Sequence, residues 1–191
     1  MFGIILDADL RVVPNENYTL ERVVVPCDQY VATLIRKTEQ ASDIALVYGR
    51  LRLTQEKFLT EGIINLFHRV PSKGTLVTCL TDPKQAELKR LVFRGTAGSD
   101  YGKQLRWEAE AHLDAVISGS AFERNALLYE PVALFQNRRR DSTDILMECF
   151  VTSGQFEPFL GELRRIVPRN QADLMNVTVR PRYRLDVTVC R

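Results

Sequence analysis

The sequence has few of the features that mark membrane-embedded or secreted proteins. No apolar run approaches the roughly 20 residues that a membrane-spanning helix requires. The opening stretch MFGIILDADLRVV has no basic leader and carries two aspartates, so we expect no signal peptide. The four cysteines stand far apart without metal-ligand spacing, which is typical of reduced thiols. Together these absences predict a cytoplasmic protein without a transmembrane segment.

Charge and motifs also argue against nucleic-acid, nucleotide and metal sites. The formal net charge is +2, too small to indicate a nucleic-acid partner. The glycine-containing run 95–103 resembles a phosphate loop, but Ala97 and Gln104 stand where that loop needs glycine and serine or threonine. His68 and His112 are isolated in the sequence, so we expect no metal site.

What the sequence does contain is an ordinary globular composition and a repeated pattern. It has 191 residues, of which 45% are hydrophobic and 26% charged, enough to build a full core. A strand–helix–strand pattern occurs twice, at 18–53 and at 143–180. The predicted fold class is therefore α+β, with a mostly antiparallel sheet built from two strand–helix–strand repeats and flanked by helices.

The first repeat is predicted as a strand at 18–25, a helix at 28–40 and a strand at 44–53. The helix has apolar residues at helical spacing, and the second strand alternates. This alternation places Tyr48 and Arg50, together with Arg52, on one face of the sheet.

The second repeat begins at 143–151, where Glu148 is the only charge inside an apolar run after Asp144. Such a run predicts a central strand that is covered on both faces. A helix is predicted from 155 to 167, followed by an alternating strand at 174–180. Asn176, Thr178 and Arg180 share one face of that strand, which is either solvated or lines a ligand site. The pattern alone favours solvent.

The remaining segments predict a first strand at 3–13, a strand or irregular stretch at 58–70, and a strand at 76–80. Two helices follow: one starts at 81–83, and the other runs from 99 to about 116. A loop is expected at 118–129. The apolar sides expected for the helices are Leu88, Leu91 and Val92 in the first and Leu105, Ala109, Leu113 and Val116 in the second.

Seven segments together resemble one enzyme family: FGIILDADLRVVPNE, VVVPCDQYV, YGRLRL, GKQLRWEAE, RNALLYEPVALFQNR, TDILMECFV and ADLMNVTVR. They are similar, in order, to the FAD-linked oxidases of the vanillyl-alcohol oxidase superfamily. The branch that they resemble contains the aldonolactone oxidases, the decaprenylphosphoryl-ribose oxidases and the sterol Δ24-reductases. The resemblance implies that 1–14 is the last strand of an otherwise missing FAD-binding domain and that 15–180 is the cap, or substrate, domain. It leaves 181–191 as a divergent or truncated tail.

The resemblance also implies cofactor contacts. Gly3 and Ile4 match the strand that closes the FAD domain, where backbone groups lie against the dinucleotide. Arg180 matches an arginine that faces the flavin, where its fixed charge would stabilise negative charge on the ring or a developing oxyanion. Thr178 stands where related lactone and alditol oxidases have glutamate, and threonine is a poor general base.

The catalytic residues implied are Arg180 and Glu148, the carboxylate expected on the neighbouring strand. The substrate-binding residues implied are Asn176, Thr178, Tyr48 and Arg50. The implied function is oxidation of a secondary alcohol of a sugar, lactone or polyol by hydride transfer to FAD. The chain alone is expected to bind FAD poorly and to have no turnover. The alternative is a non-catalytic ligand-binding or interaction module with the same sheet.

Overall fold

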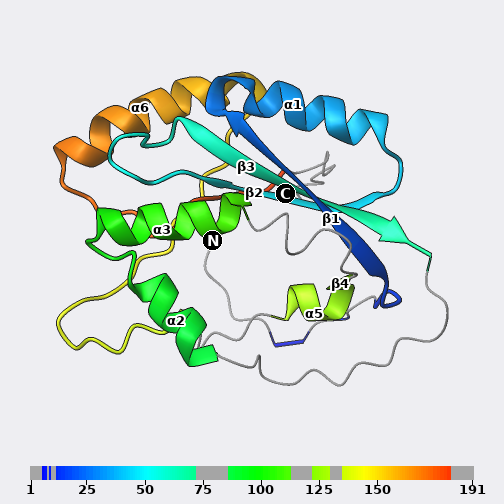
Figure 1. Cartoon of the computed structure of the whole chain (residues 1–191), viewed down its shortest axis with the longest axis horizontal. Coiled ribbons are helices and arrows are strands. Elements are labelled where there is room, and N and C mark those ends of the chain that lie inside the picture. The colour runs from blue at the N-terminus through cyan, green and yellow to red at the C-terminus, as the bar shows by residue number, and fades with distance from the viewer. Residues whose placement is uncertain are drawn as a thin grey trace.

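The structure is a computed structural model that describes residues 6, 7, 9, 12–71, 86–112, 122–129 and 135–181. It confirms an α+β fold. Five strands form one antiparallel sheet in the order β4-β1-β3-β2-β5, with helices on both faces (Figure 1). The elements are β1 (Asn17–Pro26), α1 (Cys27–Gln40), β2 (Ile44–Leu51), β3 (Glu61–Val70), α2 (Ala86–Arg94), α3 (Asp100–His112), β4 (Phe122–Glu123), α5 (Arg124–Leu128), η2 (Ser153–Gln155), α6 (Phe156–Arg169) and β5 (Thr178–Val179).

The first strand–helix–strand unit forms as predicted, with β1, α1 and β2 within two residues of the expected bounds. Residues 58–70, predicted to be a strand or irregular, are mostly strand, because β3 occupies most of that stretch. β3 lies between β1 and β2 and runs antiparallel to both. β1 and β2 are therefore parallel to each other, joined by α1, with a third strand inserted between them.

The main core lies between the sheet and the helix pair α1 and α6, which lie above the sheet in Figure 1. Alternate residues of the strands face these helices, and β3 also buries Ile63 and Phe67, which alternation places on the opposite face of the sheet. The rings of Tyr30 on α1 and Phe156 on α6 stack with centroids 5.3 Å apart. The buried members of the core are Val25, Cys27, Tyr30, Leu51, Leu53, Leu59, Ile64, Leu66 and Leu160.

The strand predicted at 143–151 is wrong. Residues 144–150, called the exposed segment from here on, are extended but belong to no strand. Ile145 is 85% exposed, Leu146 98% and Phe150 71%. A strand is stable only when a neighbour satisfies its backbone groups, and the sheet formed by the described residues does not include this segment. The second repeat is thus reduced to α6 and a short β5.

The sides that the two central helices turn inward also differ from the prediction. Leu88, Leu91 and Val92 of α2 and Leu105 of α3 are all more than half exposed, whereas Trp107 of α3 is buried. α3 packs its polar side on the sheet, because the strand face beneath it is itself polar. Within the predicted loop 118–129, β4 and α5 form two short elements.

Several predictions fall on residues that the structure does not describe. The strand at 76–80, residues Leu113 and Val116, and most of the strand at 3–13 lie outside the described ranges. The described residues Val12 and Val13 are exposed and are not in a strand. In the described part of the chain, no helix is long and apolar enough to cross a membrane.

Candidate functional site

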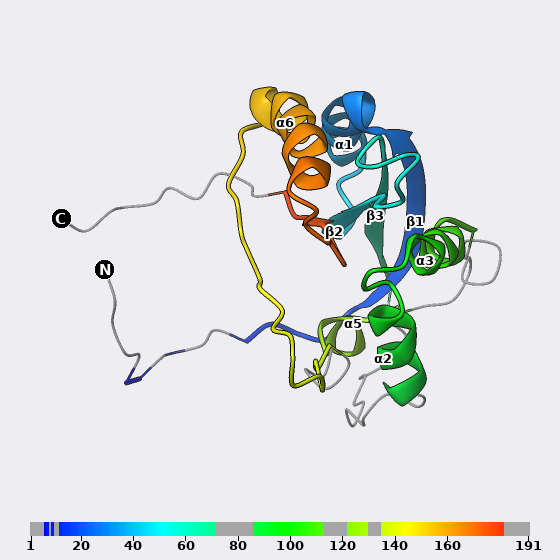
Figure 2. The same cartoon turned by 90° about the vertical axis from the view of Figure 1, so that its left-hand side faces the viewer.

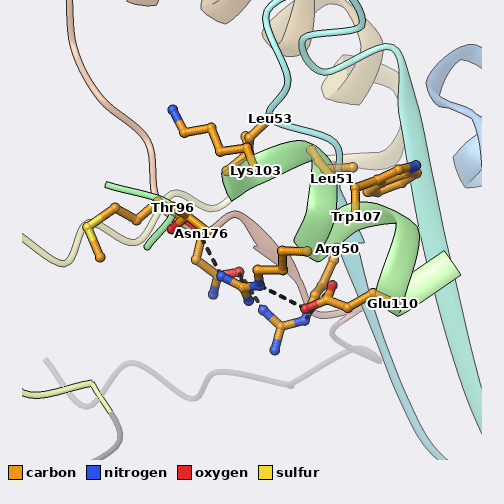
Figure 3. A pocket seen from close by; sticks show the side chains of 10 residues that line it. Arg50, Leu51, Leu53, Thr96, Lys103, Trp107, Glu110 and Asn176 are labelled. Atoms are coloured by element: carbon orange, nitrogen blue, oxygen red, sulfur yellow. Dashed lines mark hydrogen bonds and ion pairs between the residues drawn. The ribbon is translucent and has the colours of Figure 1, made fainter. Parts of the chain in front are cut away.

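Polar side chains gather where β5 joins β2, on the sheet face opposite the main core (Figure 3). Arg50 of β2 is paired in register with Thr178 of β5. The Arg50 guanidinium donates to Oδ1 of Asn176 over 2.5 Å, and the Asn176 amide donates to the Thr178 hydroxyl over 3.1 Å. Three residues that the sequence placed in separate repeats are therefore joined by hydrogen bonds.

Helix α3 covers one side of this cluster and adds two residues. Arg106 donates to Glu110 on the next turn over 2.9 Å and reaches Oδ1 of Asn176 at 3.4 Å. The other carboxylate oxygen of Glu110 lies 3.6 Å from Nε of Arg50. One carboxylate therefore faces two guanidinium groups, so the cluster keeps a surplus of positive charge.

Contacts at the start of α3 fix its position over the sheet. Ser99 caps the helix by accepting a hydrogen bond from the backbone N–H of Gly102 over 3.1 Å. A Cβ at Gly102 would lie 2.1 Å from the carbonyl oxygen of Gly95, so this close approach requires glycine. Asp173, just ahead of β5, accepts from Lys103 at 2.5 Å and from the N–H of Gly98 at 2.6 Å. The start of α3 and the approach to β5 are thus tied together.

Arg52 forms the anchor beneath the cluster. It is 7% exposed and donates to Glu61 at 2.6 Å, to Gln104 at 2.8 Å and to the Thr54 hydroxyl at 2.9 Å. Its guanidinium also lies over the Trp107 ring, 5.4 Å from the centroid, in cation–π geometry. The hydrogen bond from Lys57 lowers the pKa of Glu61 most. Arg52 lowers this pKa further, whereas partial burial raises it. Glu61 is therefore ionised near neutral pH, and Arg52 has a structural role.

A small pocket lies between α3 and the β2–β5 pair, with a volume of about 30 Å³. This volume is close to that of one water molecule in the liquid, so the pocket encloses neither a sugar nor a flavin ring. The polar cluster instead forms an open wall. The pocket is lined by Arg50, Leu51, Leu53, Thr96, Lys103, Arg106, Trp107, Glu110, Met175 and Asn176 (Figure 3).

The structure brings together only some of the predicted site residues. Arg50, Asn176 and Thr178 are joined as described above. Arg180 directly follows the last residue of β5 and is exposed. Tyr48 instead stacks on Phe67, with ring centroids 5.8 Å apart, and packs in an aromatic cluster.

Two further predictions do not join the wall. Glu148 lies in the exposed segment and not on a strand beside β5, so its predicted position in the sheet is wrong. The reason is the missing strand itself, since the prediction relied on 143–151 being paired. Gly3 and Ile4, the predicted FAD contacts, lie outside the described residues.

Sequence reasoning missed Arg106, Trp107 and Glu110. An Arg–Glu pair four residues apart is most often a solvated helix face, and the apolar residues Leu105 and Ala109 predicted the opposite orientation of α3. The alternation of polar residues at 48–52 could have indicated this orientation of α3. A polar strand face that is covered by a helix needs polar side chains on that helix as partners.

The described residues contain no group of three or more histidine, cysteine, aspartate or glutamate side chains that could hold a metal ion. Comparison of the chain with protein-family models, curated proteins and solved structures gives no match.

Proposed function

We propose that this chain is the substrate-domain portion of an FAD-dependent oxidoreductase that oxidises a secondary alcohol of a sugar, lactone or polyol. Two independent lines support this proposal. One is the ordered resemblance of seven sequence segments to the FAD-linked oxidases. The other is the open wall at the β2–β5 junction, where Arg50, Asn176 and Thr178 are joined and the exposed Arg180 follows directly after β5.

The chemistry of the wall fits one side of a flavin and alcohol site. Guanidinium, amide and hydroxyl groups are donors suited to the carbonyl-bearing edge of the isoalloxazine ring and to sugar hydroxyls. The wall is open, so a second surface has to complete the site, which agrees with an FAD domain supplied from outside residues 15–180. Bound FAD would supply the hydride acceptor.

Each residue of the wall has a distinct role in this proposal. Arg180 is exposed and would supply a fixed positive charge for the negative charge of the reduced flavin. Asn176 and Thr178 orient the substrate hydroxyls, and Arg50 holds Asn176 in place through the 2.5 Å hydrogen bond. Glu110 bridges Arg50 and Arg106, so its role is to position these two guanidinium groups.

The proposal is tested by flavin fluorescence quenching with the purified chain, alone and mixed with a separately expressed FAD domain from the resembled family. We expect binding to tighten when both parts are present. Arg180→Met should reduce that affinity about tenfold, the cost of losing one charge-assisted hydrogen bond. Arg169→Met is the matched control, because Arg169 is an exposed arginine at the end of α6. Equal affinities for the two variants, or no binding under either condition, would overturn the proposal.

A non-catalytic interaction module is the second candidate, and the exposed segment favours it. Six consecutive residues, Ile145–Phe150, present four large apolar side chains to solvent. Monomeric proteins rarely leave such a stretch uncovered. Substrate-dependent reduction of FAD in the mixed system would argue against this candidate.

A further inference from the structure

Two guanidinium groups of the open wall converge on one neutral atom. Arg50 of β2 and Arg106 of α3 both donate to Oδ1 of Asn176, over 2.5 Å and 3.4 Å (Figure 3). Within the described part of the chain, Glu110 is the one carboxylate that contacts these arginines. One of its oxygens lies 2.9 Å from Nε of Arg106 and the other 3.6 Å from Nε of Arg50. Two positive charges therefore share one negative charge and an amide oxygen.

The anchor beneath the wall has the opposite balance of charge. Arg52 is 7% exposed and faces two carboxylates, with Glu61 at 2.6 Å and Glu108 at 3.9 Å. A buried guanidinium with a structural role is thus neutralised by carboxylates. Arg50 lies on the same face of β2, two residues before Arg52, yet among the described residues the wall has no second carboxylate. This surplus charge lies on the side of the sheet that α3 covers, away from α1 and α6 (Figure 2).

Arg50 also has a donor left for a ligand. Its Nη1 donates to Asn176 and its Nε faces Glu110, so within the described ranges its Nη2 has no partner. Arg106 instead uses all three of its nitrogens, because it also donates to the carbonyl oxygen of Met175 over 3.3 Å. Arg50 can therefore bind a ligand directly, and Arg106 adds a second fixed charge beside it.

An oxyanion with two or more oxygens matches this arrangement. The planar fork of a guanidinium pairs with carboxylate and phosphate groups through charge-assisted hydrogen bonds. The side chains of Arg50 and Arg106 are 23% and 15% exposed, so solvent and salt screen their charges less than those of fully exposed arginines. A neutral polyol would leave the surplus charge uncompensated.

We propose that the substrate of the wall carries a carboxylate or phosphate group, which Arg50 binds directly and Arg106 stabilises through its charge. This inference rests on the proposed function, because it names the substrate class of the same site: a sugar or polyol with an oxyanion group. The hydroxyls of the same molecule lie against Asn176 and Thr178, the residues that orient substrate hydroxyls in the proposed function.

The test is isothermal titration calorimetry of the full chain with gluconate, sorbitol 6-phosphate, inorganic phosphate and neutral sorbitol. Gluconate and sorbitol 6-phosphate are polyols that carry the two kinds of oxyanion group. We expect one of them to bind at least about tenfold more tightly than sorbitol and inorganic phosphate, which is the gain from one charge-assisted hydrogen bond. Its identity distinguishes carboxylate from phosphate. In the 15N-labelled chain, the Nε–Hε resonance of Arg50 should shift on addition of the same probe.

Asn176→Asp is the informative variant. Aspartate has the shape of asparagine, and the Thr178 hydroxyl can donate to it where it now accepts. The new carboxylate neutralises the surplus charge where the two guanidinium groups converge, so the preference for the anionic polyol over sorbitol should fall at least about tenfold. Arg50→Gln should reduce this preference by a similar factor. The matched controls are Gln155→Glu and Arg169→Gln, which make the same changes of charge at exposed residues of the α6 region.

A preference for an anionic polyol that Asn176→Asp and Arg50→Gln both abolish, with both controls retaining it, would support the proposal. Equal affinity for anionic polyol and sorbitol, or a preference that either variant retains, would overturn it. Inorganic phosphate that binds as tightly as sorbitol 6-phosphate would indicate a site for the free ion and would also overturn it. The same holds if no probe binds to the chain, alone or mixed with the FAD domain.

FAD binding in the mixed system separates this inference from the proposed function. If FAD binds and the anionic preference is absent, the substrate class is wrong and the proposed function stands. If the anionic preference is present and FAD binds under neither condition, the wall binds an oxyanion and the proposed function is overturned.

Discussion

Substituting Gly49 by alanine tests whether β2 and α1 are packed as closely as the structure shows. A Cβ at this position would lie 1.7 Å from the Tyr30 hydroxyl oxygen and 2.6 Å from the carbonyl oxygen of Ile63. The hydroxyl is at the end of a side chain, but Tyr30 is buried at 1% exposure and its ring also lies against Gly62. Neither it nor the backbone carbonyl can move freely, so the substitution must shift the strand or the helix.

The expected magnitude follows from two opposing terms. Overpacking of a core typically costs 1–3 kcal/mol, and a fixed carbonyl at this distance places the cost near the upper end, about 3 kcal/mol. Alanine also restricts the unfolded chain, which returns about 0.4–1 kcal/mol. We therefore expect Gly49→Ala to lower the free energy of unfolding by about 2 kcal/mol. In urea denaturation this corresponds to a midpoint lower by about 1 M.

Gly161→Ala is the matched control because nothing lies within 4 Å of the added Cβ in α6. It should raise the free energy of unfolding by about 0.5–1 kcal/mol through helix propensity. Tyr30→Phe combined with Gly49→Ala removes the nearest clashing atom and should recover about 1 kcal/mol as a coupling energy. A Gly49→Ala protein within about 0.5 kcal/mol of the wild type would refute the close packing of Tyr30 on β2.

Three further outcomes are expected. Arg52→Met should lower the free energy of unfolding by about 2–3 kcal/mol in urea titrations, because it leaves partly buried acceptors without their donor. The hydrogen bond from Lys57 and the charge of Arg52 lower the pKa of Glu61, although partial burial raises it. Glu61 therefore stabilises the folded protein above its ordinary pKa of 4.5, and this stabilisation is lost as the pH falls below that value. Urea midpoints between about pH 6 and about pH 3 should therefore fall less steeply in Glu61→Gln. Burial raises the pKa of Cys27 to about 12, so iodoacetamide followed by peptide mass mapping should label exposed Cys149 first and Cys27 only on unfolding.

The part of the fold that could be predicted is the part that local patterns determine. The apolar alternation of β1 and β2 and the helical spacing of α1 placed all three elements, since each buries one face against the same core. The same alternation placed Arg50, Asn176 and Thr178 on a polar side of the sheet. That they touch one another depends on the β2–β5 pairing, which no local pattern encodes.

The orientation of α3 shows where local patterns fail. Leu105 and Ala109 predicted an apolar inner side, yet the structure buries Trp107 and turns the polar side inward. The strand face below contains Arg52, which needs the Gln104 amide and the Trp107 ring above it. Satisfying a buried guanidinium outweighs burying one leucine, because an unpaired buried charge costs several kcal/mol and a leucine side chain gains about 1.5–3 kcal/mol.

The strand predicted at 143–151 is wrong for a different reason. Its composition is that of a strand covered on both faces, and the structure keeps it extended but leaves Leu146 almost fully exposed. An apolar extended stretch left in water at that exposure gives up roughly 1.5–3 kcal/mol per large side chain that burial would return. The sequence is therefore suited to a sheet wider than the described residues form.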